Sequence, residues 1–234
     1  MNDWYDFDLS TSGHIISCKE DTGCSCTAND RCSFYQGYQE GSAYRGFMVS
    51  DQVYFGDSHH TKEDAFRFSF GCVSTETNMF YDQIADGILG MGMNRHLGGV
   101  SSQGPIYESM KKEGVIDKLM FNICLGKNGG WMQMGGYDQA RLLEKPKWFK
   151  LTNPKAPNYR FTLNGVSMHD HFMDGSKSWN VAFVDSGTTY TYVPAQMWEA
   201  LMANFDYFCD QTKNIHDAKG RKKYCTGQRY TTEM

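Results

Sequence analysis

The segment with the clearest chemical potential is FVDSGTT, residues 183–189, in which one carboxylate lies among hydroxyls and a glycine. The four apolar residues that end just before Asp185 predict a buried strand, so the acid is expected at the end of a low-dielectric wall, where an isolated charge is costly. Ser186 and Thr188 offer hydroxyl groups, and Gly187 allows a tight turn that brings backbone N–H groups onto the carboxylate. The pattern predicts an acid that is held in one defined orientation.

The elements that position this loop are predicted to be mostly strands. Short aromatic and β-branched segments, separated by glycines, recur along the chain, whereas helical spacing of apolar residues occurs only in residues 104–119 and 194–208. The second helix is expected to begin at Pro194, where a missing N–H costs nothing. A Pro- and Lys-containing segment, residues 142–158, is the predicted boundary between two domains, residues 1–145 and 146–234. The predicted strands include GFMVSDQVYFGD, FRFSFGC, FNICLG, WMQMGGYD and WFKLTN.

Composition narrows the class of protein. The 234 residues are 40% hydrophobic and carry a formal net charge of −4 with interspersed signs, which gives no reason to expect a nucleic acid or an anionic membrane as partner. No stretch has the apolar length of a membrane-spanning helix, and the first ten residues do not resemble a signal peptide. An even number of cysteines favours disulfides and an oxidising compartment: Cys18, Cys24, Cys26, Cys32, Cys72, Cys124, Cys209 and Cys225.

Several motifs in sequence order resemble the landmarks of pepsin-like (A1-type) aspartic peptidases. FVDSGTT resembles the active-site loop of that family, and QGYQEGSAYRGFMVSDQV, residues 36–53, resembles its flap hairpin, with Tyr38 as the flap tyrosine and Gly41 and Ser42 at the tip. FGCVSTETNMFYDQIADGILGMG resembles the segment that braces the first active-site loop, MQMGGYD the turn before the second lobe, and YRFTLNGVSM the strand pair before the second loop. The cysteine-rich approach to the flap resembles the plasmepsin V-like and nepenthesin-like branch.

The resemblance implies a mainly β, bilobal fold and a mechanism with two aspartates, one from each lobe, that share a proton and activate a water molecule. Asp185 would be one of the two. Ser186 would brace the two loops, Gly187 would donate its N–H, and Thr188 would bind the outer carboxylate oxygen. Thr189 would line the substrate cleft, and the flap residues would close over the peptide.

The second aspartate is expected outside this sequence. The other Asp-Thr-Gly, residues 21–23, follows Cys-Lys-Glu instead of an apolar strand, precedes Cys24, and lies only 17 residues before Tyr38. We interpret it as a polar turn among cysteines. The chain is therefore expected to be an internal fragment: residues 1–145 the remainder of the first lobe with its flap, and residues 146–234 the beginning of the second.

Alternative sites are weaker. The four clustered cysteines lack the paired C-x2-C spacing of common zinc sites, so disulfides are expected, with the pairing inside the cluster left open. Outside it, Cys72 with Cys124 and Cys209 with Cys225 are plausible pairs. The histidines at 59, 60, 169 and 171 are expected in solvated loops, and the G-x-S-x-G elbow of serine hydrolases is absent. We expect no metal and no cofactor.

The sequence therefore predicts an aspartic endopeptidase that acts on polypeptide substrates in the secretory pathway, whether extracellular, vacuolar or in the ER lumen. As a fragment, the chain is expected to be inactive by itself, and a membrane anchor in missing regions is compatible with it. A non-catalytic pepsin-like binding or inhibitor module is the alternative, and a truncated product without activity is a third possibility.

Overall fold

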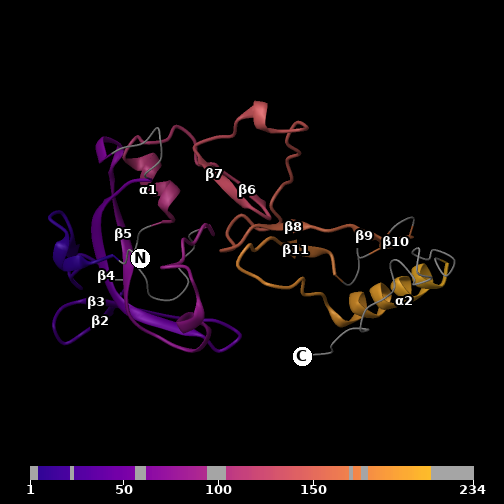
Figure 1. Cartoon of the computed structure of the whole chain (residues 1–234), viewed down its shortest axis with the longest axis horizontal. Coiled ribbons are helices and arrows are strands. Elements are labelled where there is room, and N and C mark those ends of the chain that lie inside the picture. Colours follow the sequence, from indigo (N-terminus) through magenta and orange to yellow (C-terminus); the bar gives the residue numbers. More distant parts are fainter. Residues whose placement is uncertain are drawn as a thin grey trace. The chain divides into compact units, whose positions relative to one another are not determined.

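The computed structural model describes residues 5–21, 24–55, 62–93, 104–168, 171–174 and 179–211. Strands dominate it and two α-helices accompany them, which confirms the mainly β prediction. The chain forms two compact units, one of Met1–Trp148 with Lys155–Pro157 and one of Phe149–Pro154 with Asn158–Met234. No helix in the described ranges is long and apolar enough to cross a membrane. Figure 1 labels the elements of each unit.

The first unit contains a five-stranded antiparallel sheet built around one long strand, β4. Strand β4 (Ala43–Val53) pairs along nearly its whole length with β5 (Phe66–Glu76). On its other edge, its first half pairs with β3 (Cys32–Gly37) and its second half with β1 (His14–Ile15), while β2 (Ser25–Cys26) pairs with β3. The long ribbon of β4 and β5 is visible in Figure 1.

A bulge between Arg45 and Gly46 interrupts the register of β4 against β5. At this point the two backbones approach so closely that a Cβ on Gly46 would collide with the carbonyl oxygen of Cys72. Bulges increase the local twist of a strand pair and bend the strand that carries them. Glycine is required at this position because any side chain would push the strands apart.

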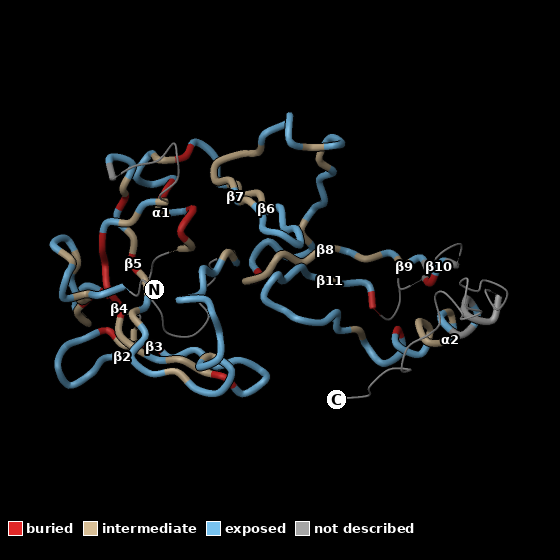
Figure 2. Tube along the Cα trace, in the orientation of Figure 1, coloured by how far each residue is buried: buried red, intermediate tan, exposed pale blue. Residues whose placement is uncertain are grey.

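Two apolar clusters form the core of the first unit. One is beneath β3 and β4 and contains Ile16, Cys32, Phe34 and Met48. In the other, helix α1 (Ile106–Lys112) packs against β5 and buries Ile106, Tyr107 and Met110 together with Phe66 and Ile116. Figure 2 shows the buried stretches of β4 and α1 in red.

A buried carboxylate, Asp51, ties the N-terminal segment to β4. Its Oδ2 accepts hydrogen bonds from Tyr5 Oη (2.8 Å) and Ser10 Oγ (2.6 Å), and its Oδ1 accepts from Ser12 Oγ (2.5 Å) and the Gln52 N–H (2.7 Å). Burial alone would raise the pKa of Asp51, but these four donors outweigh it and lower the pKa to about 2. Conversely, burial and the adjacent Asp51 carboxylate raise the pKa of Tyr5 to about 12.

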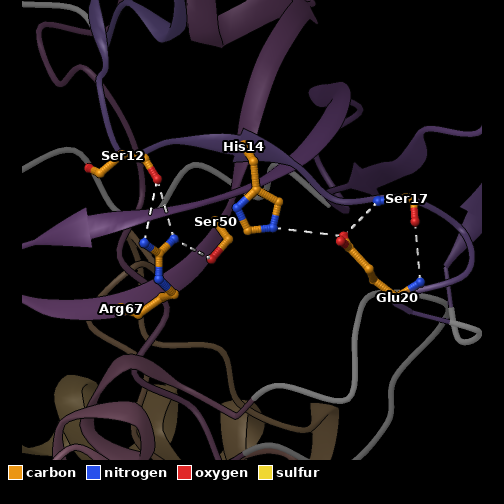
Figure 3. A network of polar contacts seen from close by, with 6 residues as sticks. All are labelled: Ser12, His14, Ser17, Glu20, Ser50 and Arg67. Carbon is orange, nitrogen blue, oxygen red and sulfur yellow. Dashed lines mark hydrogen bonds and ion pairs between the residues drawn. The ribbon is translucent and has the colours of Figure 1, made fainter.

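A second polar network continues this anchor across the sheet. The Arg67 guanidinium of β5 donates to the carbonyl oxygen of Ser12 (3.4 Å) and to Ser50 Oγ (3.5 Å), as Figure 3 shows. Farther along the chain, Ser17 and Glu20 bond reciprocally, the Ser17 N–H to Glu20 Oε2 (3.0 Å) and the Glu20 N–H to Ser17 Oγ (3.3 Å). This Ser-x-x-Glu box fixes the turn that leads into the cysteine cluster.

The first unit also contains smaller elements. Strands β6 (Phe121–Gly126) and β7 (Gly129–Met134) form a separate hairpin, and β6 coincides with the predicted FNICLG segment. Four 3-10 turns complete the described elements outside strands and α-helices: η1 (Phe7–Leu9), η2 (Lys62–Asp64), η3 (Asn78–Asp82) and η4 (Gln139–Arg141).

The second unit contains two separate two-stranded sheets and helix α2. Strand β8 (Arg160–Thr162) pairs with β11 (Val181–Phe183), and β9 (Gly165–Met168) pairs with β10 (His171–Asp174). Its core, around Met173, Trp179 and Met197, lies between β9, β10 and the beginning of α2 (Ala195–Gln211). The expected strand pair in YRFTLNGVSM is therefore wrong in its pairing, because β8 and β9 bind different partners.

Two other element predictions need correction. The helix expected over residues 104–119 is shorter, since it ends at Lys112 and Gly114 follows with a φ of +78°, a left-handed conformation that stops a helix. WFKLTN forms no strand; only Leu151 bridges to Phe161. The second predicted helix is present, beginning one residue after Pro194.

Candidate active site

Asp185 follows strand β11 by two residues, as the sequence predicts, but the strand is not buried. Val181, Phe183 and Val184 expose 50%, 54% and 69% of their surface, and Asp185 itself is exposed. Figure 2 shows this stretch largely in pale blue. The expectation of a low-dielectric wall is wrong for this structure, because β11 pairs only with β8 and no described layer covers its faces.

The loop after β11 nevertheless fixes the orientation of the acid. The Gly187 N–H donates to Asp185 Oδ1 (2.9 Å), and Thr188 Oγ1 donates to Asp185 Oδ2 (2.6 Å). The Thr188 N–H also donates to the Asp185 carbonyl oxygen (3.3 Å), which closes the turn. Each carboxylate oxygen therefore has one donor from the loop, and each keeps a lone pair that is open to water.

This arrangement suits proton transfer. A carboxylate that is held at both oxygens cannot rotate freely, so its remaining lone pairs point in defined directions. Because the group is exposed, a water molecule or a second acid can reach it. Ser186 and Thr189 are also exposed, and within the described part of the chain their side chains form no hydrogen bonds. They are therefore available to contact other groups.

The hairpin predicted as the flap is formed by β3 and β4, with residues 38–42 as its turn. The Tyr38 N–H donates to the Ser42 carbonyl oxygen (2.9 Å), and Gly41 has a φ of +91°, a conformation that glycine adopts without strain. Tyr38 is 37% exposed, whereas Ser42 is 1% exposed and its Oγ accepts a hydrogen bond from the Met79 N–H (3.3 Å). The expected role of Ser42 in contacting substrate therefore does not fit the position of its side chain, which braces the hairpin from inside.

The other Asp-Thr-Gly segment differs from the loop at Asp185. Asp21 closes a turn in which its N–H donates to the Ser17 carbonyl oxygen (3.2 Å), and no strand precedes it directly. Asp21 is buried, whereas a residue in an ordinary polar turn would be exposed to solvent. Thr22 and Gly23 lie outside the described residues.

The cysteine cluster contains two overlapping disulfides, Cys18–Cys26 and Cys24–Cys32. This confirms the preference for disulfides in the cluster. The sulfurs of Cys18, Cys24 and Cys26 lie within 4.8 Å of one another, but each is already bonded to another sulfur and is no free thiolate for a metal.

The proposed pairs outside the cluster fare differently. Cys72 and Cys124 are free, so that pair is wrong: Cys72 is on β5, opposite Phe47, and Cys124 is on β6 in a different sheet. Burial raises the pKa of the Cys72 thiol. Cys225 lies outside the described residues, as do His59, His60 and His169, and the side chains of Cys209 and His171 are likewise not described.

The segment DGILG, residues 86–90, has no regular structure and is exposed, with Ile88 at 55% and Leu89 at 43%. The sequence patterns did not single out two residues with long-range hydrogen bonds: Asp51, which accepts from four donors, and Asn78, whose side-chain amide donates to the Gly41 carbonyl oxygen. A residue-level signal existed only for Asp51, an acid inside a run of strand-forming residues.

The sequence of this chain is similar to that of a known protein family and of several known proteins. The sequence model of the family described as eukaryotic aspartyl protease matches residues 15–224. Aspartic protease 5 of Toxoplasma gondii is 32% identical over 159 residues, covering 61% of this chain and 16% of that protein. Plasmepsin V of Plasmodium falciparum is 25% identical over 270 aligned residues, covering 94% of this chain and 44% of that protein.

Candidapepsin-1 of Candida albicans (strain WO-1) is 28% identical over 197 residues, covering 82% of this chain and 44% of its own length. The chain thus spans less than half the length of each of these three relatives. Because the family match extends over most of the 234 residues, the chain belongs to the eukaryotic aspartyl protease family.

Proposed function

We propose that this chain is part of an aspartic-type endopeptidase in which Asp185 is one of two catalytic carboxylates. The observation that carries the proposal is the loop itself: the Gly187 N–H and the Thr188 hydroxyl hold the two oxygens of an exposed acid two residues after a strand. The partner aspartate is supplied by residues beyond these 234, because the other Asp-Thr-Gly is confined in the disulfide cluster. The two compact units then represent portions of the two lobes.

The chemistry is general acid–base catalysis. The ionised carboxylate of the pair takes a proton from a water molecule, whose oxygen attacks the scissile carbonyl carbon. The protonated carboxyl donates its proton to the carbonyl oxygen, giving a tetrahedral diol. Collapse of the diol breaks the C–N bond, and a proton passes to the leaving amine.

The remaining residues have supporting roles in the proposal. Gly187 and Thr188 keep the Asp185 carboxylate oriented, and Ser186 connects this loop to the loop that carries the other aspartate. Thr189 and Tyr38 contact the polypeptide substrate, with Gly41 at the tip of the hairpin that closes over it. Ser42 supports that tip from inside, where its hydroxyl is buried.

We further propose that the protein acts in the secretory pathway or outside the cell. Its two disulfides require an oxidising compartment, and one similar protein is named secreted aspartic protease 1 of Candida albicans. The match to plasmepsin V over 94% of this chain supports placement in the cysteine-rich branch that contains that protein.

The experiment uses the complete gene product that contains these residues, with an unstructured peptide library as substrate. Replacing the acid by its amide (Asp185→Asn) keeps the shape of the loop but removes the proton-transfer group, and we expect the cleavage rate to fall about 10²- to 10⁴-fold. Asp138→Asn is the matched control, an exposed acid that caps η4 and lies in the other unit. Wild-type cleavage by the Asp185→Asn protein would overturn the assignment.

The 234 residues alone provide a second arm of the same experiment. We expect them to cleave no peptide, and Asp185-dependent cleavage by the purified 234-residue chain would contradict the need for an external partner. Peptide binding without any cleavage by the complete product would favour the alternative, a non-catalytic binding module.

A further inference from the structure

The tip of the β3–β4 hairpin is not a free end, because two residues of another segment bond to its turn and the residue before them bonds to the start of β4. The Asn78 side-chain Nδ2 donates to the Gly41 carbonyl oxygen at 2.7 Å. The backbone N–H of the next residue, Met79, donates to the buried Ser42 Oγ at 3.3 Å. The segment therefore binds the turn at its last two residues, Gly41 and Ser42.

The third residue, Thr77, joins the same segment to the start of β4. Its N–H donates to the Ala43 carbonyl oxygen (2.9 Å), and the Ala43 N–H donates to Thr77 Oγ1 (3.0 Å). These bonds continue the β4–β5 ladder one step past its last pair, Tyr44 with Glu76. The chain then turns into η3, so this segment leaves the sheet at the residues that contact the hairpin turn.

The conformation of Asn78 shows that this contact is specific. Its φ is +53°, a left-handed conformation that is uncommon outside glycine and that asparagine tolerates better than most residues. This conformation accompanies the bond from its amide to Gly41 O, the shortest of the bonds to the tip. A left-handed residue with a side chain facing the turn is retained where the surroundings fix it.

Aromatic packing reinforces the contact. The Phe80 ring of η3 lies edge-on against Tyr38 (centroids 5.5 Å apart) and Tyr44 (5.4 Å), and the Tyr38 and Tyr44 hydroxyls are 3.2 Å apart. Edge-to-face pairs of this kind add to the free energy of burying the rings. The residue that the family resemblance assigns to the lid, Tyr38, is therefore positioned by η3 as well as by its own hairpin.

We propose that Asn78 is a positioning residue for the substrate lid: its amide clasps the hairpin tip at Gly41, so that the hairpin and residues 77–82 move as one unit over a bound polypeptide. This inference rests on the proposed function for the role of the hairpin, while the clasp itself is defined by the bonds above. A lid that opens without residues 77–82 must break all of these bonds, whereas one that carries them along keeps Tyr38 oriented. Loss of the clasp therefore weakens peptide binding and has little effect on the rate of the chemical step.

Hydrogen exchange of the 234-residue chain tests the clasp without any reference to activity. Asn78→Asp keeps the size of the side chain and its tolerance of positive φ, but it replaces the amide donor by an acceptor that faces the Gly41 carbonyl. We expect the backbone amides of Ala43, Thr77 and Met79 to exchange about fivefold faster or more, because one neutral hydrogen bond is lost. Exchange at wild-type rates would overturn the clasp.

Two further variants separate the hydrogen bond from backbone strain and from a general effect. Asn78→Gly relieves the positive φ and removes the donor, so faster exchange at the tip is expected here also, and wild-type exchange would show that the amide does not matter. Asn204→Asp is the matched control, since Asn204 Nδ2 donates to the Ala200 carbonyl oxygen (2.8 Å) in α2. It is expected to leave the hairpin amides unchanged.

Kinetics of the complete gene product test the positioning role. We expect Asn78→Asp to raise KM about fivefold and to change kcat less than twofold. Faster exchange together with an unchanged KM would overturn the positioning role and leave only a structural clasp. A complete product that cleaves nothing would refute the proposed function and this role with it, while the exchange result would still decide whether the clasp exists.

Discussion

The buried carboxylate of Asp51 provides the sharpest test of how the first unit is held together. The substitution is Asp51→Asn, which keeps the size of the side chain and removes its charge. In the wild type, two donors bind each carboxylate oxygen, three of them hydroxyls from residues 39 to 46 positions away in sequence. The amide oxygen of the variant can still accept hydrogen bonds, but its nitrogen is a donor and would face two hydroxyl groups that also donate. These hydroxyls would have to reorient so that they accept.

The expected loss follows from these bonds. Hydrogen bonds to a charged group contribute about 1.5–3 kcal/mol and neutral ones about 1 kcal/mol, so neutralising the acceptor weakens each of four bonds by about 1 kcal/mol. Burying an amide costs less than burying a charge, which offsets part of the loss. We expect the free energy of opening of β4 to fall by about 3 kcal/mol near pH 7.

The assay is hydrogen exchange of β4 peptides in increasing urea, because it reports on this unit separately from the second. The control, Asp138→Asn, removes an exposed acid that accepts from the Ala140 N–H (2.9 Å), and it is expected to cost less than about 1 kcal/mol. An Asp51→Asn protein within about 0.5 kcal/mol of the wild type would refute the reasoning.

The pH dependence supplies a second criterion for the same variant. The folded-state pKa of Asp51, about 2, lies below its ordinary value of 3.8, so its contribution is present above pH 4 and is lost as the pH falls from about 4 to 2. The difference between wild type and Asp51→Asn should therefore shrink over that window. A difference that stays constant from pH 6 to pH 2 would contradict the assigned cause. Because its pKa is about 2, the Asp51 carboxylate stays ionised at mildly acidic pH.

Two other predictions concern the sheets. Gly46→Ala should lower the stability of the β4–β5 ribbon by about 3 kcal/mol in the same exchange assay, because the added Cβ would overlap the Cys72 carbonyl oxygen. The control is Gly136→Ala, where the added Cβ meets open space; it should change the stability by less than about 1 kcal/mol. Iodoacetamide at pH 8 should alkylate the exposed Cys124 at least about tenfold faster than Cys72, because burial raises the pKa of the Cys72 thiol. Mass spectrometry of the native protein gives both alkylation rates, and equal rates would contradict the assigned environments.

Local features were predictable from the sequence because their causes are local. The limits of β6 follow from an apolar segment between two polar turns, and the helix after Pro194 follows from its apolar spacing. The bonds from Gly187 and Thr188 to Asp185 form within four residues of sequence. A short turn with the right residue types closes in much the same way wherever it occurs.

Features that depend on distant partners were not predictable. The exposure of β11 depends on what packs over it, which an apolar tetrapeptide does not specify. The three hydroxyl donors to Asp51 and the bond from Asn78 to Gly41 join residues more than 35 positions apart. The cysteine pairing was equally open, because four cysteines allow three connectivities and spacing alone favours none.

The two overlapping disulfides have a consequence for the proteolysis of this segment. Together they span every peptide bond from Cys18 to Cys32, a stretch whose described residues 25–31 are all exposed. A single proteolytic cut anywhere in that stretch leaves the two halves covalently joined. The strands on either side therefore stay attached after the cut, and a nicked molecule would release no fragment until it is reduced.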